Sequence, residues 1–220
     1  MTEIEAIRAR HAVRNYTAKP LSPEIIDELS QEIEQCNRQG QLHIQLVTEN
    51  EDAFKTFIPL FGRFKNVKNY IALAAKKQGD FYVKCGYYGA RLMVKAQQAG
   101  LNSCWVTNTY NAKKCPVTLA PDEELVGVIA IGYGTTDGTQ HKSKSMERLC
   151  KPCSDKWFTD GMNAAVLAPT GLNRQNFFIE ANGNTVSIRT KDNHPMSQIN
   201  TGIVKYHFEI GAGRENFNWE

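Results

Sequence analysis

The longest apolar segment of the chain, residues 81–99, limits the possible folds more than any other feature. Apolar side chains lie on one helical face of this segment and on the neighbouring faces as well, and Gly100 follows it directly. A helix that is apolar on most sides is buried in a core, and glycine is typical of the position just after a helix. We therefore expect a long central helix around which the rest of the chain packs.

Shorter patterns before this segment predict two helices and a strand. Apolar residues at helical intervals predict a helix from Thr2 to Arg14. Ser22 and Pro23 fit the cap and the first turn of a second helix that continues through Ile33. Alternation of apolar and polar residues predicts a short strand over residues 42–46.

After the central helix, strands and helices follow one another without regular alternation. Strands are predicted at 103–106, 125–131, 177–180 and 185–189, the last two joined by an Asn182-Gly183 turn, and helices at 157–167 and 198–211. This order favours an α+β fold with mixed or antiparallel sheets over a doubly wound parallel sheet.

An internal similarity predicts two related halves. The tripeptide Asn-Arg-Gln occurs after a helix at 37–39 and again at 173–175, and each half continues to a helix that ends in Ala-Gly. The polar, glycine-containing connection over residues 135–144 is the best boundary. We therefore predict a duplication, with halves 1–134 and 135–220 packed as one globular unit. A chance match of the tripeptide is the alternative.

Composition and charge exclude several classes of protein. A chain of 220 residues with 41% apolar residues can bury a large core without disulfides. The excess of 26 basic over 23 acidic residues is too small and too dispersed for nucleic-acid binding, whereas an anionic small molecule fits it. No apolar run approaches the roughly 18 residues of a membrane span. Because the amino terminus lacks a leader-like segment, we expect a cytoplasmic protein whose six cysteines are thiols.

Two pairs of basic residues are candidates for binding a phosphate. Arg10 and Arg14 would project from one face of the first predicted helix, where like charges repel each other unless an anion lies between them. Arginine suits a phosphate because its planar guanidinium donates to two oxygens at once. Lys142 and Lys144 form a second cluster on a predicted loop. For both pairs the alternative is a solvated basic surface.

The loop of residues 168–175 has side chains that suit a planar heterocycle. Pro169 stops the preceding helix, and Gly171 allows a ligand to approach the backbone closely. Thr170, Asn173 and Gln175 offer both hydrogen-bond donors and acceptors. As structure alone, the same residues are an ordinary helix stop.

The remaining motifs are weaker. The glycines at 132 and 134 lack the third glycine and the following helix of a dinucleotide-binding fingerprint. Cys150 and Cys153 have the spacing of a zinc or redox pair, but no second pair completes a zinc site. We therefore predict no metal, and a redox dithiol stays as an alternative function.

Together, these segments resemble the FMN-dependent nitroreductase family. The family's amino-terminal arginine motif is similar to RHAVRNY at 10–16. Its Gly-Leu-Gly-x-Cys-Trp segment is similar to AGLNSCWV at 99–106, and its Ala-Pro-Ser loop is similar to APTGLNRQNFF at 168–178. In the typical family member that loop comes early and FMN lies at a homodimer interface. Here the loop comes late, which resembles a single-chain branch in which one chain imitates the dimer, as a monomer or a weak homodimer.

The resemblance implies a flavin site and an activity. FMN would take a hydride from NADH or NADPH and reduce a small organic acceptor such as a nitroaromatic or quinone, with no acid, base or nucleophile from the protein. The implied cofactor-binding residues are Arg10, Arg14, Lys142 and Lys144 at the phosphate with His11 nearby, Val106, Thr107 and Asn108 facing the isoalloxazine, and Pro169, Thr170, Gly171 and Asn173 on its other side, supported by Gln175.

Two departures from the family pattern leave an alternative open. Ala12 replaces a serine that usually bonds the phosphate, and Thr107 and Asn108 replace residues that usually touch the reactive ring. The alternative is a non-catalytic FMN- or nucleotide-binding protein.

Overall fold

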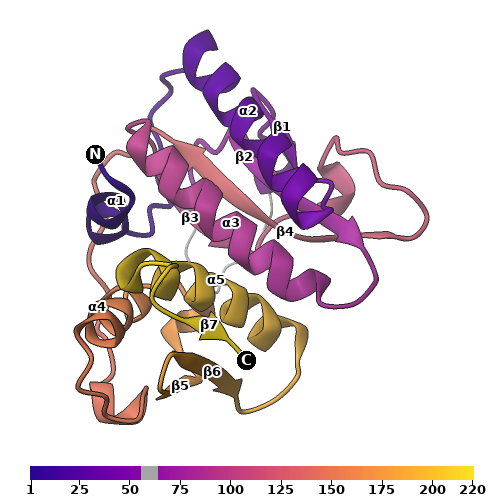
Figure 1. The fold of residues 1–220 in the computed structure, drawn as a ribbon. Helices are drawn as coiled ribbons and strands as arrows, with labels where there is room; N and C mark the ends of the chain where they lie inside the picture. Colours follow the sequence, from indigo (N-terminus) through magenta and orange to yellow (C-terminus); the bar gives the residue numbers. More distant parts are fainter. Residues whose placement is uncertain (56–63) are drawn as a thin grey trace. The chain divides into compact units, whose positions relative to one another are not determined.

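The computed structural model describes residues 1–55 and 64–220 and has an α+β fold (Figure 1). The helices are α1 (Glu3–Ala9), α2 (Pro23–Gly40), α3 (Phe81–Gln98), α4 (Lys156–Ala165) and α5 (Pro195–Ala212). The strands are β1 (Gln45–Val47), β2 (Asn69–Lys76), β3 (Asn102–Val106), β4 (Glu123–Gly132), β5 (Phe177–Asn182), β6 (Thr185–Thr190) and β7 (Asn218–Trp219). The long helix at residues 81–99 is confirmed as α3, in which every residue is buried or half-buried.

The chain divides into two compact units, each built from separate segments. The arginine unit comprises Ala9–Phe81 and Leu92–Gln140, and the loop unit comprises Met1–Arg8, Tyr82–Arg91 and His141–Glu220. The predicted halves, 1–134 and 135–220, describe an ancestral duplication of the sequence, whereas these units describe which residues pack together. The duplication therefore stays a prediction.

The arginine unit is built on a four-stranded antiparallel sheet in the order β1-β2-β4-β3. Seven of the eight residues of β2 are buried, as expected for an inner strand covered on both faces. α2 begins as predicted, because Ser22 Oγ accepts a hydrogen bond from the Ile25 amide and Pro23 occupies the first turn.

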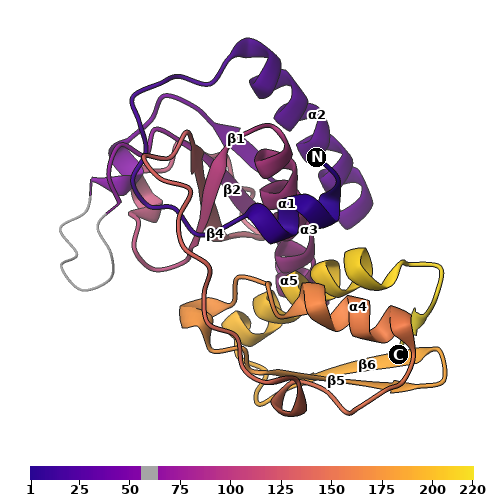
Figure 2. The same cartoon turned by 90° about the vertical axis from the view of Figure 1, so that its left-hand side faces the viewer.

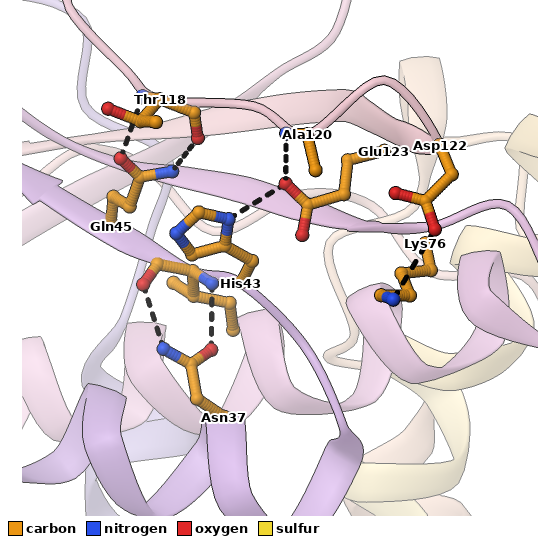
Figure 3. A network of polar contacts seen from close by, with 9 residues as sticks. Asn37, His43, Gln45, Lys76, Thr118, Ala120, Asp122 and Glu123 are labelled. Carbon is orange, nitrogen blue, oxygen red and sulfur yellow. Dashed lines mark hydrogen bonds and ion pairs between the residues drawn. The ribbon is translucent and has the colours of Figure 1, made fainter.

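A polar network joins the start of β4, the turn before it and the edge of the sheet (Figure 3). His43 Nδ1 lies 2.8 Å from Glu123 Oε2, and the Ala120 amide donates to the same oxygen at 2.8 Å. Gln45 exchanges two hydrogen bonds with the backbone of Thr118. The Glu123 side chain is only 8% exposed, so its carboxylate is the buried centre of this network.

The stability of the protein should depend on the ionisation of Glu123. Hydrogen bonds from His43 and from the Ala120 amide lower the pKa of Glu123 below its ordinary value of 4.5. A lowered pKa means that the stabilisation is present above about pH 4.5 and is lost as the pH falls through the lower folded-state value. We expect the free energy of unfolding of Glu123→Gln, measured by urea titration, to fall less steeply than that of the wild type below this pH.

Asp122→Asn is the matched control for this prediction. It removes an exposed ion pair with Lys76 beside the same network, and it should leave the wild-type pH dependence in place. Equal slopes for Glu123→Gln and the wild type would contradict the assignment of this carboxylate as the titrating group.

The loop unit contains the three-stranded sheet β5-β6-β7, and α4 and α5 lie over its β5–β6 hairpin (Figure 2). α5 approaches its neighbours at glycines. A Cβ atom added to Gly202 would lie 1.9 Å from the Val83 carbonyl oxygen, and one added to Gly86 would lie 2.1 Å from that of Ile199. Because Val83 and Gly86 belong to α3, the part of α3 in this unit contacts α5 backbone to backbone.

Two sequence expectations differ from the structure, and one strand was not expected. The predicted helix from Thr2 to Arg14 is wrong beyond Ala9, because Ala12 forms a parallel bridge with Ser103 and the Val13 amide donates to the Ser103 carbonyl. Residues 37–39 form part of α2 instead of following a helix as residues 173–175 do after α4. Strand β2 was not predicted.

Within residues 1–55 and 64–220, no helix has the length and apolar character needed to cross a membrane.

Candidate flavin-binding residues

The arginine motif of residues 10–16 lies after the end of α1 and is not helical: it touches the edge strand β3 at a single bridge, between Ala12 and Ser103. Arg10 therefore does not share a helical face with Arg14, and the two side chains differ in environment. Arg10 is 4% exposed, whereas Arg14 is exposed. Among the described residues, the Arg10 Nε and Nη1 atoms have no hydrogen-bond partner. A buried guanidinium in this state is the clearest candidate for an anion ligand among the residues that the structure describes.

The electrostatics around Arg10 strengthen this interpretation. Burial lowers the pKa of Arg10 to about 10, so the side chain is still a cation at neutral pH. The Cys104 thiol interacts electrostatically with Arg10, but burial raises the pKa of this thiol and keeps it neutral. The chain thus holds a buried positive charge for which Cys104 supplies no counterion.

The other predicted residues of the arginine unit lie at the ends of this segment and of β3. His11 is half-buried, and its Cβ lies 2.9 Å from the position of a Cβ added to Gly138. Val106 is the buried last residue of β3, Thr107 is half-buried and Asn108 is exposed. These last three residues therefore lead outward from the sheet.

In the loop unit, the segment after α4 contains an unusual series of left-handed residues. Leu172, Asn173 and Gln175 have φ values of 52°, 53° and 44°, respectively. For Leu172 and Gln175 this conformation costs about 1–2 kcal/mol each, whereas asparagine adopts it more readily. The conformation of Leu172 and Gln175 persists only where surrounding contacts enforce it. Such strain is frequent where a backbone is shaped to meet a ligand.

Gln175 is the centre of the contacts that hold this loop. It is 1% exposed, its Nε2 donates to the Val166 carbonyl at 2.9 Å, and its amide donates to Thr170 Oγ1 at 3.1 Å. His141 Nε2 and Ser143 Oγ lie 2.9 and 3.2 Å from the same Val166 oxygen, at the end of α4. Gln175 thus holds the loop from within, and its supporting role toward a flavin stays a prediction.

The predicted basic loop contacts the predicted flavin loop directly. Asn173 Nδ2 donates to the Lys142 carbonyl at 2.8 Å. Lys144 Nζ donates to the carbonyls of Arg174 and Gln175 at 2.5 and 3.1 Å. The structure therefore brings together Lys142, Lys144, Thr170, Asn173 and Gln175, with Pro169 and Gly171 in the same loop.

One residue of this arrangement was missed by sequence reasoning. Asn200 Oδ1 accepts a hydrogen bond from the Gly171 amide at 3.0 Å. Asn200 belongs to α5, and a Cβ added to Gly171 would also meet Met196 Sδ of this helix at 3.1 Å. No local pattern marks Asn200, because its partner lies 29 residues earlier in the chain.

Of the Cys150 and Cys153 pair, Cys150 has the environment of a structural thiol. Both are reduced, and the Cys150 thiol donates to the Met146 carbonyl at 3.5 Å. Burial raises the pKa of Cys150, whereas a reactive cysteine has a lowered one. The geometry therefore gives less support to the redox-dithiol alternative than to a flavin site.

Comparison with known proteins agrees with the sequence resemblance. The family described as "Putative TM nitroreductase" matches residues 3–212. No curated protein matches the sequence.

Among solved structures, a putative nitroreductase from Thermotoga maritima MSB8 is 21% identical, with a TM-score of 0.67 over 98% of this chain and 85% of that one. A putative nitroreductase in complex with FMN from Desulfovibrio desulfuricans is 14% identical, with a TM-score of 0.57 over 70% of this chain and 99% of that one. A putative NADH dehydrogenase/NAD(P)H nitroreductase from Parabacteroides distasonis is 19% identical, with a TM-score of 0.54 over 67% and 95% of the two chains.

The structural matches confirm the predicted nitroreductase-like α+β fold. Because the family match extends over nearly the whole chain, this protein is a member of the nitroreductase family.

Proposed function

We propose that this nitroreductase-family oxidoreductase binds FMN, takes a hydride from NADH or NADPH and reduces a small organic acceptor such as a nitroaromatic or quinone. The observation that carries the proposal is the buried Arg10 guanidinium, whose Nε and Nη1 have no partner among the described residues. A phosphate monoester supplies the dianion and the acceptor oxygens that these two donors require. The Desulfovibrio desulfuricans relative, described in complex with FMN, and the NAD(P)H in the name of the Parabacteroides distasonis relative support the cofactor and the donor.

The residues present fit FMN in separate ways in the two units. In the arginine unit, Arg10 would hold the phosphate, with the exposed Arg14 adding positive charge beside it. In the loop unit, Pro169, Thr170, Gly171 and Asn173 of the strained loop would lie against the isoalloxazine. Bound FMN would supply the hydride and electron transfer, and these side chains would bind and orient it.

The test is the absorption spectrum of the freshly purified full-length protein, followed by release and identification of the cofactor. We expect a flavin spectrum that yields FMN on denaturation, and steady oxidation of NADH or NADPH when a quinone or nitroaromatic is added. Colourless protein that does not take up added FMN would refute the proposal. Bound FMN without turnover by either nicotinamide would favour the non-catalytic alternative, for which the altered residues Ala12, Thr107 and Asn108 are the sequence basis.

A further inference from the structure

Lys144 contacts one residue of the flavin loop from several directions. Its amide donates to Gln175 Oε1 at 2.7 Å, and its ammonium donates to the carbonyls of Arg174 and Gln175 at 2.5 and 3.1 Å. These two carbonyls belong to the peptide groups on either side of Gln175. Lys144 therefore fixes the orientation of both peptides and of the side chain between them.

Gln175 needs such fixing, because its backbone is left-handed with φ at 44°. A left-handed residue other than glycine relaxes unless its neighbouring peptide groups are held. The Gln175 amide and side chain are held by Thr170 and Val166. In the described part of the chain, the carbonyls at 174 and 175 are held by the Lys144 ammonium. The contacts made by Lys144 thus complete the set that maintains the loop.

The same contacts limit what Lys144 can do for a phosphate. An ammonium has three donors, and carbonyls of the described loop take two of them. Only the third donor could reach a phosphate oxygen without breaking these contacts and releasing the strained peptide groups. Arg10 has the opposite character, since its Nε and Nη1 are buried and have no partner in the described part of the chain.

We propose that Lys144 is a positioning residue of the flavin loop rather than a ligand of the FMN phosphate. The proposal rests on the proposed FMN function, and it replaces the role that the family resemblance gives to Lys144. It implies that Lys144 matters equally for a flavin with a phosphate and for one without.

The test compares FMN with riboflavin, which has the same ring system and no phosphate. Dissociation constants of the full-length wild type, Lys144→Met and Arg10→Met are measured by quenching of flavin fluorescence. Lys144→Met should weaken both flavins by the same factor, about tenfold, the size expected for a lost charged hydrogen bond. Arg10→Met should weaken FMN far more than riboflavin. The control is Lys191→Met, which removes an exposed lysine of the same unit and should change neither constant.

A second measurement does not need a flavin. In the cofactor-free Lys144→Met variant, the backbone amides of residues 144 and 175 should exchange hydrogen faster than in the wild type. Both amides donate hydrogen bonds that hold the loop. The overall melting temperature and circular dichroism report whether the variant is folded.

The outcomes separate the two proposals. A Lys144→Met variant that loses affinity for FMN alone and keeps wild-type exchange would show a phosphate ligand and overturn the positioning role. Unchanged affinity for both flavins together with unchanged exchange would overturn it as well. If the wild type binds neither flavin, the proposed FMN function fails, and the exchange rates then decide the role of Lys144 by themselves.

Discussion

Replacing Arg10 by methionine is expected to weaken FMN binding about a hundredfold or more and to make the cofactor-free protein more stable. Two charge-assisted hydrogen bonds from Nε and Nη1 would contribute roughly 1.5–3 kcal/mol each, which corresponds to a factor of about 10² to 10⁴ in affinity. Methionine keeps much of the length of the side chain and fills the buried position without a charge. Loss of affinity in this variant would therefore come mainly from the lost guanidinium.

The gain in stability follows from the same geometry. Without an anion, Arg10 is a buried cation, and burial lowers its pKa to about 10. Holding a buried cation without a partner costs on the order of 3 kcal/mol, and a well-packed apolar side chain avoids this cost. Urea unfolding of the cofactor-free proteins should therefore give a higher free energy of unfolding for Arg10→Met than for the wild type.

Arg14→Met is the matched control, since Arg14 belongs to the same segment and is exposed. We expect it to weaken FMN about tenfold or less and to leave the unfolding free energy within about 0.5 kcal/mol. If Arg10→Met binds FMN as tightly as the wild type, Arg10 is not the phosphate ligand and the main support for the FMN proposal is lost.

Gly202→Ala is expected to lower the free energy of unfolding by about 3 kcal/mol or more. An alanine Cβ at this position would lie 1.9 Å from the Val83 carbonyl oxygen and 2.6 Å from the Tyr87 nitrogen. These are backbone atoms of a buried helix, so α3 and α5 would have to separate where they meet in the loop unit. Inserting a methyl group into such packing lowers the free energy of unfolding several times more than an ordinary surface substitution does. Thermal and urea unfolding of the cofactor-free variant would measure the loss.

Gly79→Ala serves as the comparison, because it tests backbone strain without crowding. Gly79 has φ at 57° and nothing lies within 4 Å of an added Cβ. Its replacement should cost only about 1 kcal/mol. Equal losses at the two positions would show that helix contact is not what requires glycine at 202.

Elements with strong local signals could be predicted from the sequence, and elements fixed by tertiary pairing could not. The apolar segment at 81–99 and the Ser22-Pro23 start each define a helix by nearby residues alone, and both are confirmed. Strand β2 is a short, continuous apolar run, a pattern that fits a buried strand and a buried helix equally well. The helix at 2–14 was predicted too long because isolated bridges to Ser103, Lys65 and Gly134, all distant in sequence, fix the backbone after Ala9.

The candidate site divides in the same way. Residue types marked Arg10 and the loop at 168–175, but burial decides that Arg10 and not Arg14 has the features of an anion ligand. Burial depends on the whole fold and has no local signature. The same is true of Asn200 and of the contact between Lys144 and the loop, which join residues 29–31 positions apart. The predicted duplication is a matter of ancestry, on which the compact units do not decide.

The segmented make-up of the two units has a consequence for how the chain folds as it is synthesised. Every residue of the arginine unit has been translated once residue 140 is made, so this unit can form while the rest of the chain is still growing. The loop unit must wait, because Tyr206 near its end donates a hydrogen bond to Glu3 near its beginning. The residues around Glu3 thus stay without this partner until Tyr206 has been made, and the contact closes a loop of 203 residues, which is a slow step in folding.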